Sequence, residues 1–139
     1  MRTKTLLLFL LFLTGIGFSQ DKNAGQEISV GEINALLWQQ HLSMVMAKAE
    51  SYGYKSDAGS TTYTKGDHVF RISFLTDKGP FEYTESKPSQ ERIKTLKEQA
   101  LKFGCKLLLD DQTGILLEGK GLTIRIRTNM IKISLVKPK

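Results

Sequence analysis

The chain has 139 residues, of which 40% are hydrophobic and 24% are charged, and its formal net charge at pH 7 is +6. This length is enough for one domain of ordinary size and too short for two independent hydrophobic cores. A single cysteine excludes a fold that depends on disulfide bonds.

Residues 1–19 predict a cleavable secretory signal peptide. Arg2 and Lys4 precede an uncharged apolar stretch at 6–18, and small residues stand before a cleavage site after Ser19. That stretch is shorter than the roughly 20 residues of a membrane-spanning helix, so a retained anchor is the weaker alternative. We therefore expect export to the periplasm or the extracellular space, with no transmembrane segment after cleavage.

Removal of the signal peptide changes how the charge is interpreted. The mature chain has 18 Lys and Arg against 14 Asp and Glu, a formal charge of +4. Residues 20–86 carry six cations and nine anions, whereas residues 87–139 carry twelve and five. This asymmetry steers an anionic partner toward one surface, or it makes the two halves attract each other.

We expect a flexible N-terminal segment at 20–28, followed by a single α+β domain at 29–139. Ser29 and Glu32 form a capping-box pattern and predict one long helix at 30–52, which ends at Gly53.

The predicted helix at 30–52 has two apolar stripes on different faces. Ile33, Leu36 and Leu37 belong to one stripe. The second stripe is the candidate partner-binding surface, because an exposed tryptophan among aliphatic side chains is typical of interfaces. Its candidate residues are Trp38, Leu42, Val45 and Tyr52. The alternative is that the domain folds around the helix and buries both stripes.

Residues 61–86 read as strands with turns between them. A turn at Asp77–Lys78 would place Phe74 opposite Phe81, Ile72 opposite Tyr83 and Arg71 opposite Thr84.

A second helix is predicted at 87–103, with Ser86 as its cap, Pro88 in its first turn and Gly104 after its end. Its apolar stripe faces a sheet, and its cations are expected to face solvent. The stripe comprises Ile93, Leu96, Ala100 and Phe103, and the cations are Arg92, Lys94, Lys97 and Lys102.

A four-stranded antiparallel meander is predicted at 105–136. Strict alternation places Cys105, as a buried reduced thiol, on one face with Leu107 and Leu109. The predicted cross-strand partners are Leu117 with Leu122, Ile126 with Ile131, Ile124 with Ile133 and Leu122 with Leu135.

The register of the last hairpin forces Arg125 opposite Lys132, with Arg127 two residues along. Like charges directly opposed across two strands are destabilising, so something should compensate them. Solvent, salt or nearby carboxylates such as Asp110, Asp111 and Glu118 are one answer. The other is an anion, which makes Arg125, Arg127 and Lys132 the candidate anion-binding residues. Nucleic acid is not expected, because no aromatic side chains are interleaved with these cations.

The order helix, strands, helix, strands suggests a duplicated α-β-β-β unit, with predicted repeats at 29–86 and 87–137. This layout resembles small exported proteins with tandem helix-plus-antiparallel-sheet units, such as the families of the β-lactamase inhibitory protein and of PepSY-type domains. The chain lacks the cysteine pairs of that inhibitor. The resemblance implies a binding or inhibitory module without chemistry of its own.

No catalytic, metal-binding or cofactor-binding motif is present in the sequence. Asp110–Asp111 is the only adjacent carboxylate pair and lies in a predicted turn, and His41 and His68 are far apart in sequence. We therefore expect no enzyme, no metal and no cofactor. The sequence favours an exported binding module whose partner is a protein or an envelope component. The alternative is a carrier or sensor of a small apolar or anionic ligand.

Overall fold

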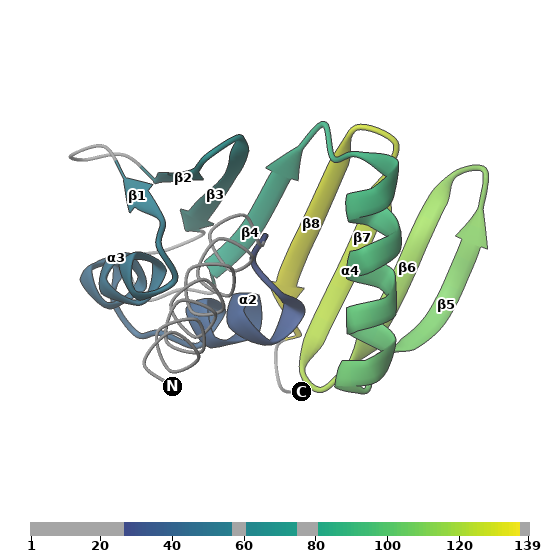
Figure 1. Cartoon of the computed structure of the whole chain (residues 1–139). Coiled ribbons are helices and arrows are strands. Elements are labelled where there is room, and N and C mark those ends of the chain that lie inside the picture. The colour runs from purple at the N-terminus through teal and green to yellow at the C-terminus, as the bar shows by residue number, and fades with distance from the viewer. Residues whose placement is uncertain (1–26, 57–60, 75–80, 137–139) are drawn as a thin grey trace, which may run out of the picture.

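An antiparallel sheet of eight strands forms the centre of the molecule, in the order β1-β2-β3-β4-β8-β7-β6-β5 (Figure 1). The computed structural model describes residues 27–56, 61–74 and 81–136, so the predicted signal peptide lies outside the described residues. The strands are β1 (Lys55–Ser56), β2 (Thr62–Lys65), β3 (His68–Phe74), β4 (Phe81–Ser86), β5 (Lys106–Asp111), β6 (Gly114–Gly119), β7 (Leu122–Arg127) and β8 (Met130–Leu135). The predicted α+β class with an antiparallel sheet is confirmed.

Three helices in the described ranges accompany the sheet, one more than the sequence predicted. They are α2 (Val30–Leu37), α3 (Leu42–Ser51) and α4 (Gln90–Phe103). In Figure 1, α4 runs in front of β7, with β8 on one side and β6 on the other, and α2 lies in front of β4 and β8. None of the helices in the described part is long and apolar enough to cross a membrane.

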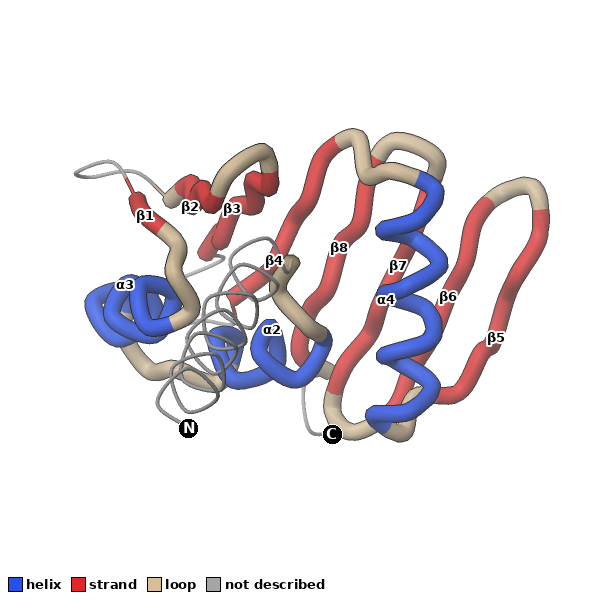
Figure 2. The backbone as a smooth tube through the Cα atoms, in the orientation of Figure 1, coloured by secondary structure: helices blue, strands red, loops and turns tan. Residues whose placement is uncertain are grey.

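The single helix predicted at 30–52 is wrong, because the chain leaves the helix between Leu37 and Leu42 (Figure 2). The predicted capping box is confirmed, since Ser29 N donates to Glu32 Oε1 at 3.1 Å and Glu32 N donates to Ser29 Oγ at 3.2 Å. On one straight helix the two apolar stripes would point in different directions. The break lets both halves turn an apolar side to the core, which buries Ile33 in α2 and Val45 in α3.

The start of α4 also differs from the prediction. Ser89, not Ser86, caps the helix, and its Oγ accepts from Arg92 N at 3.0 Å. Ser86 instead extends β4, where it lies opposite Met130 of β8. The predicted end of the helix is confirmed, because Gly104 takes a left-handed conformation with φ of 114°.

Most of the predicted strand registers are confirmed. Ile72 lies opposite Tyr83 in the first half of the sheet, and Ile124 lies opposite Ile133 in the second. The other confirmed pairs are Arg71 with Thr84, Phe74 with Phe81, Ile126 with Ile131, Leu122 with Leu135 and Arg125 with Lys132. The predicted turn at 77–78 lies outside the described residues.

The register predicted between β6 and β7 is wrong. Leu117 lies opposite Ile124, and Gly119 takes the place opposite Leu122. The turn therefore falls on Lys120 and Gly121, whose φ angles are 54° and 78°. Two central residues with positive φ are what a tight hairpin turn requires, and a glycine at the second position makes this pair favourable.

One hydrophobic core lies between the helices and the sheet and contains side chains from both halves of the chain. Cys105 is buried with a free thiol, as predicted. Ile28 is also buried, so the packed part of the chain begins before Ser29. The strict alternation predicted after Cys105 is wrong, because a bulge between Leu107 and Leu109 shifts the register of β5 against β6.

Candidate functional site

The face of the sheet that points away from the core, called the open face below, carries a transverse row of side chains. Core side chains such as Ile124, Ile133 and Tyr83 are fully buried, and their strand neighbours point to the open face. Across β6, β7, β8, β4, β3 and β2, direct pairing joins Leu116, Arg125, Lys132, Thr84, Arg71 and Thr62. With strands spaced about 4.8 Å apart, the three cations of this row lie within about 14 Å of one another along the sheet.

The structure brings the three predicted anion-binding residues together. Arg125, Arg127 and Lys132, with Met130, line a hollow of about 160 Å³ on the open face. Lys132 has a carboxylate partner, because its Nζ lies 3.3 Å from Glu82 Oε1. Within the described ranges, neither arginine of the hollow has a carboxylate oxygen within 4 Å. We call Arg125, Arg127 and Lys132 the cationic cluster.

Two of the carboxylates that the sequence offered as compensation, Asp110 and Asp111, have other neighbours, and the third, Glu118, lies opposite Lys106 of β5. Lys97 Nζ lies 2.5 Å from Asp110 Oδ2, and Thr113 donates to Asp111 Oδ1 from its amide at 2.7 Å and its hydroxyl at 2.5 Å. These bonds from Thr113 hold the pKa of Asp111 below its ordinary value. Among the described residues, compensation therefore comes from Glu82 on β4, and only for Lys132.

The four predicted partner-binding residues do not form one exposed surface. Trp38 is 59% exposed, Leu42 and Tyr52 are partly buried, and Val45 is fully buried. The Trp38 indole Nε1 donates to Asn34 Oδ1 at 3.0 Å. Val45 therefore belongs to the core and offers no surface to a partner, whereas Trp38 does.

A second group of polar side chains, which was not predicted from the sequence, lies in the core. Glu85 of β4 and Arg92 of α4 are both buried, and they form an ion pair. Arg92 Nε lies 3.2 Å from Glu85 Oε1, and Arg92 Nη2 donates to Glu85 Oε2 at 3.2 Å. The hydroxyl of Tyr83 donates to the same Oε2 at 2.9 Å. Glu27 adds a second carboxylate, with Oε2 3.2 Å from Arg92 Nε.

Two further residues extend this group toward α3. His68 Nε2 lies 3.1 Å from Glu85 Oε1, and His68 Nδ1 lies 2.5 Å from the hydroxyl of Tyr54. That hydroxyl also accepts from the amide of Ile28 at 3.1 Å. Hydroxyl, imidazole, carboxylate and guanidinium thus follow one another through the core. We call Tyr54, His68, Glu85 and Arg92 the buried polar chain.

The pKa values show which groups of the buried polar chain are charged. Burial alone would raise the pKa of Glu85, but the hydrogen bond from His68 and the charge of Arg92 outweigh it and leave that pKa below its ordinary value. Burial likewise opposes ionisation of Arg92, yet the Glu85 charge raises its pKa. Burial raises the pKa of Tyr54 to about 12. Burial therefore keeps the Tyr54 hydroxyl protonated, in contact with His68 and with the amide of Ile28.

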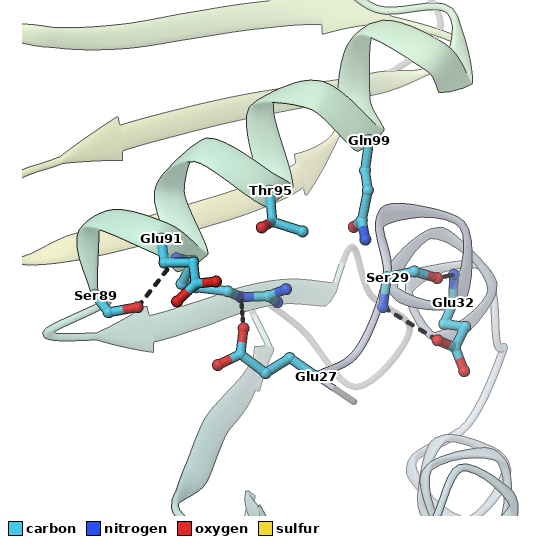
Figure 3. A pocket seen from close by; sticks show the side chains of 8 residues that line it. Glu27, Ser29, Glu32, Ser89, Glu91, Thr95 and Gln99 are labelled. Carbon is cyan, nitrogen blue, oxygen red and sulfur yellow. Dashed lines mark hydrogen bonds and ion pairs between the residues drawn. The ribbon is translucent and has the colours of Figure 1, made fainter. Parts of the chain in front are cut away.

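A cleft of about 400 Å³ opens beside the buried polar chain, between the start of α2 and the first turns of α4 (Figure 3). Thr95 and Gln99 project into it from α4, and Glu27 reaches toward it from the segment before α2. Its lining is Glu27, Ser29, Glu32, Ser89, Glu91, Arg92, Thr95 and Gln99. Three carboxylates against one guanidinium make the cleft acidic. In the part of the chain that the structure describes, no three metal-ligating side chains are placed to share an ion.

Comparison with protein-family models, with curated proteins and with solved structures finds no match for this chain. The interpretation of its sites therefore depends on their geometry.

Proposed function

We propose that the chain is an exported, non-catalytic binding module whose partner is a protein or a component of the cell envelope. The cationic cluster on the open face is its contact surface. The observation that supports this proposal most is that Arg125 and Lys132 lie directly opposite each other while neither arginine of the cluster has a carboxylate partner in the described part of the chain.

Such a cluster is unfavourable in the free protein. Like charges directly opposed on a sheet are destabilising, and among the described residues only Lys132 is partly compensated, by Glu82. An anionic partner would neutralise these charges and remove their repulsion. The free energy released in this way would add to the favourable free energy of binding. The same charges would also draw the partner in from a distance, at a rate that falls with added salt.

Retention of the mature protein on a polyanionic matrix tests this proposal. We expect the triple variant Arg125→Gln, Arg127→Gln, Lys132→Gln to elute at a much lower salt concentration than the natural sequence. The matched control replaces three exposed lysines on helices, Lys48→Gln, Lys94→Gln and Lys102→Gln, and removes the same charge. If both triple variants elute alike, total charge explains the retention and the cluster is not the contact surface.

Trp38 supports a second contact surface for the same function. Its indole is mostly exposed and lies against the β6–β7 turn, since a Cβ built on Gly121 would lie 3.6 Å from Trp38 Cζ2. We expect Trp38→Ala to change the free energy of unfolding by less than about 1 kcal/mol, as is usual for surface sites, and to abolish co-purification with a partner from envelope extract. Unfolding of the variant, or unchanged co-purification, would remove Trp38 from the proposal.

The duplicated unit is part of the same proposal. The first predicted repeat holds two helices and the second holds one, each followed by four antiparallel strands, and the sheet order is symmetrical about the contact of β4 with β8. Under this proposal the two repeats join their open faces into one continuous binding surface, to which Arg71 contributes from the first repeat and the cationic cluster from the second.

The acidic cleft favours one alternative, a carrier or sensor of a small ligand. Arg92 Nη1 is buried at its wall without a hydrogen-bond partner in the described ranges. A carbonyl or carboxylate oxygen would satisfy that nitrogen, but Glu27, Glu32 and Glu91 would repel a ligand with a net negative charge. We therefore rank this alternative second.

A further inference from the structure

Strand β5 forms one outer edge of the sheet, and in the described ranges no strand pairs with its outer side (Figure 1). All six residues of β5 are exposed. Its centre is three leucines, Leu107, Leu108 and Leu109, with exposed fractions of 41%, 56% and 41%. Unpaired backbone amides and carbonyls beside exposed leucines are a template for another strand.

The opposite edge of the same sheet is built differently. The described part of strand β1 comprises Lys55 and Ser56, and a lysine on an edge strand is one of the usual protections against pairing with another chain. Strand β5 has six residues and an apolar centre. The two edges are therefore not equivalent, and β5 is the one prepared for a partner.

The charges of β5 fit a second copy of the same strand. A lysine stands at its start, two aspartates stand at its end, and the leucines lie between them. When two such strands run antiparallel, Lys106 of each copy comes opposite Asp111 of the other, and Leu108 comes opposite Leu109. The six-residue strand thus carries complementary charges at its two ends and an apolar contact at its centre.

Because of the bulge, Lys106 and Asp111, which this register places opposite each other, lie on the same face of the sheet. Lys106 is paired with Glu118 and Asp111 with Gly114, positions that share the open face. Leu107 is paired with Leu117, and Asp110 with Ile115, on the face of the helices. Without the bulge between Leu107 and Leu109, positions 106 and 111 would lie on opposite faces and their charges could not meet.

Helix α4 adds a fourth exposed leucine at this edge. Lys97 of α4 contacts Asp110 of β5, so this side of the helix faces β5. Leu101 follows Lys97 by one turn on the same side and is 44% exposed. The leucines of β5 and Leu101 therefore form one apolar patch along the edge.

We propose that two copies of this chain form a dimer through antiparallel pairing of their β5 strands, about a two-fold axis that passes between Leu108 and Leu109. Pairing extends the sheet from eight to sixteen strands and removes the open β5 edges. The axis is perpendicular to the sheet, so the open faces of both copies point to the same side. The interface is isologous, and it closes after two copies.

Contacts within one copy do not prevent Lys106 and Asp111 from pairing with the other copy. Lys106 lies opposite Glu118, but in the described part no ion pair of 4 Å or less joins them. The bonds from Thr113 keep the Asp111 carboxylate fixed and exposed at the end of the strand. The dimer does not depend on the function proposed above, since it uses the edge of the sheet and not the cationic cluster.

A charge-reversal experiment tests both the dimer and its register. Sedimentation equilibrium of the mature chain should show a monomer–dimer equilibrium. Lys106→Glu alone and Asp111→Lys alone should each weaken self-association roughly tenfold, because like charges then face each other at both ends. An equimolar mixture of the two variants should dimerise at least as tightly as the natural sequence, because every introduced charge meets its opposite across the interface.

Two further variants separate loss of pairing from loss of folding. Leu108→Lys should abolish the dimer, while its circular dichroism and thermal unfolding stay those of the natural monomer because Leu108 is exposed. Val69→Lys makes the same change at another exposed position, on β3, and should leave dimerisation unchanged. A natural chain that stays monomeric, a mixture that associates no better than its components, or open-ended assemblies would each overturn the proposal.

Discussion

The buried polar chain and the cationic cluster lie on opposite faces of the same sheet, and they differ in how their charges are paired. Under the helices, Arg92 contacts Glu85 and Glu27, and Glu85 also contacts His68. On the open face, the cationic cluster has one carboxylate partner in the described ranges, Glu82. An unpaired charge in the core would cost several kcal/mol, whereas water tolerates one on the surface. Folding therefore requires that the charges in the core are paired. The charges of the cationic cluster remain available for a partner.

The largest effect on the free energy of unfolding is expected at Arg92. Replacement by Met leaves the buried Glu85 carboxylate without its guanidinium partner, and we expect Arg92→Met to lower the free energy of unfolding by about 3–5 kcal/mol, measured by urea denaturation. Lys94→Met removes a lysine from an exposed position of the same helix and should change it by less than about 0.5 kcal/mol.

A double variant separates the ion pair from the packing of the Arg92 side chain. Glu85→Gln keeps an acceptor for Tyr83 and removes the charge that Arg92 neutralises. The double variant Arg92→Met, Glu85→Gln should therefore recover part of the stability that Arg92→Met loses, a non-additivity typical of contacting groups. Strictly additive effects would show that charge is not what links the two residues.

Acid should affect the buried polar chain next most strongly. The pKa of folded Glu85 lies below the ordinary value of 4.5, so Glu85 contributes stability above pH 4.5 and loses it as the pH falls through the lowered pKa. Each pKa unit of lowering corresponds to about 1.4 kcal/mol. Glu85→Gln should be less stable than the natural sequence at neutral pH, and the difference should shrink in acid. A difference that does not change between neutral pH and pH 3 would contradict this assignment.

The smallest effect is expected on the open face, and it has the opposite sign. Arg125→Glu replaces a like-charge pair with an attractive pair opposite Lys132, so it should stabilise the fold by roughly 0.2–1 kcal/mol. Urea denaturation at low and high salt measures this, and the gain should decrease with salt. Arg127→Glu serves as control, because Met130 and not a cation lies opposite it. Equal gains from both variants would show that the direct pair carries no special repulsion.

The sequence predicted the cationic cluster because its geometry follows from one hairpin. Burial of Ile124, Ile126, Ile131 and Ile133 determines the register, and the register determines which cations face each other. The partner of Lys132 could not be predicted in this way. Glu82 comes close only because β8 pairs with β4, a contact between distant parts of the chain.

The buried polar chain was missed although a sequence signal existed. Arg92 precedes Leu96 by four residues, so it continues the apolar stripe of α4, and Glu85 continues the alternation of Phe81 and Tyr83. Two opposite charges at core-facing positions indicate a buried pair. The prediction assigned Arg92 to solvent because it placed every cation of that helix on the exposed side.

The break between α2 and α3 left no such signal. Residues 38–41 contain neither glycine nor proline, and the apolar pattern continues through them. Tertiary packing decides the conformation here, because the break lets both Ile33 and Val45 reach the core.

The position of β8 between β4 and β7 has a kinetic consequence. Before residues 130–135 leave the ribosome, β1–β4 and β5–β7 can form only two separate half-sheets, and the edges of β4 and β7 stay open. Closure needs contacts such as Tyr83 with Ile133, which span much of the sequence, and such non-local pairing slows folding. The completed sheet is therefore a late and cooperative product, and the nascent chain is most exposed to misassembly just before its eighth strand is inserted.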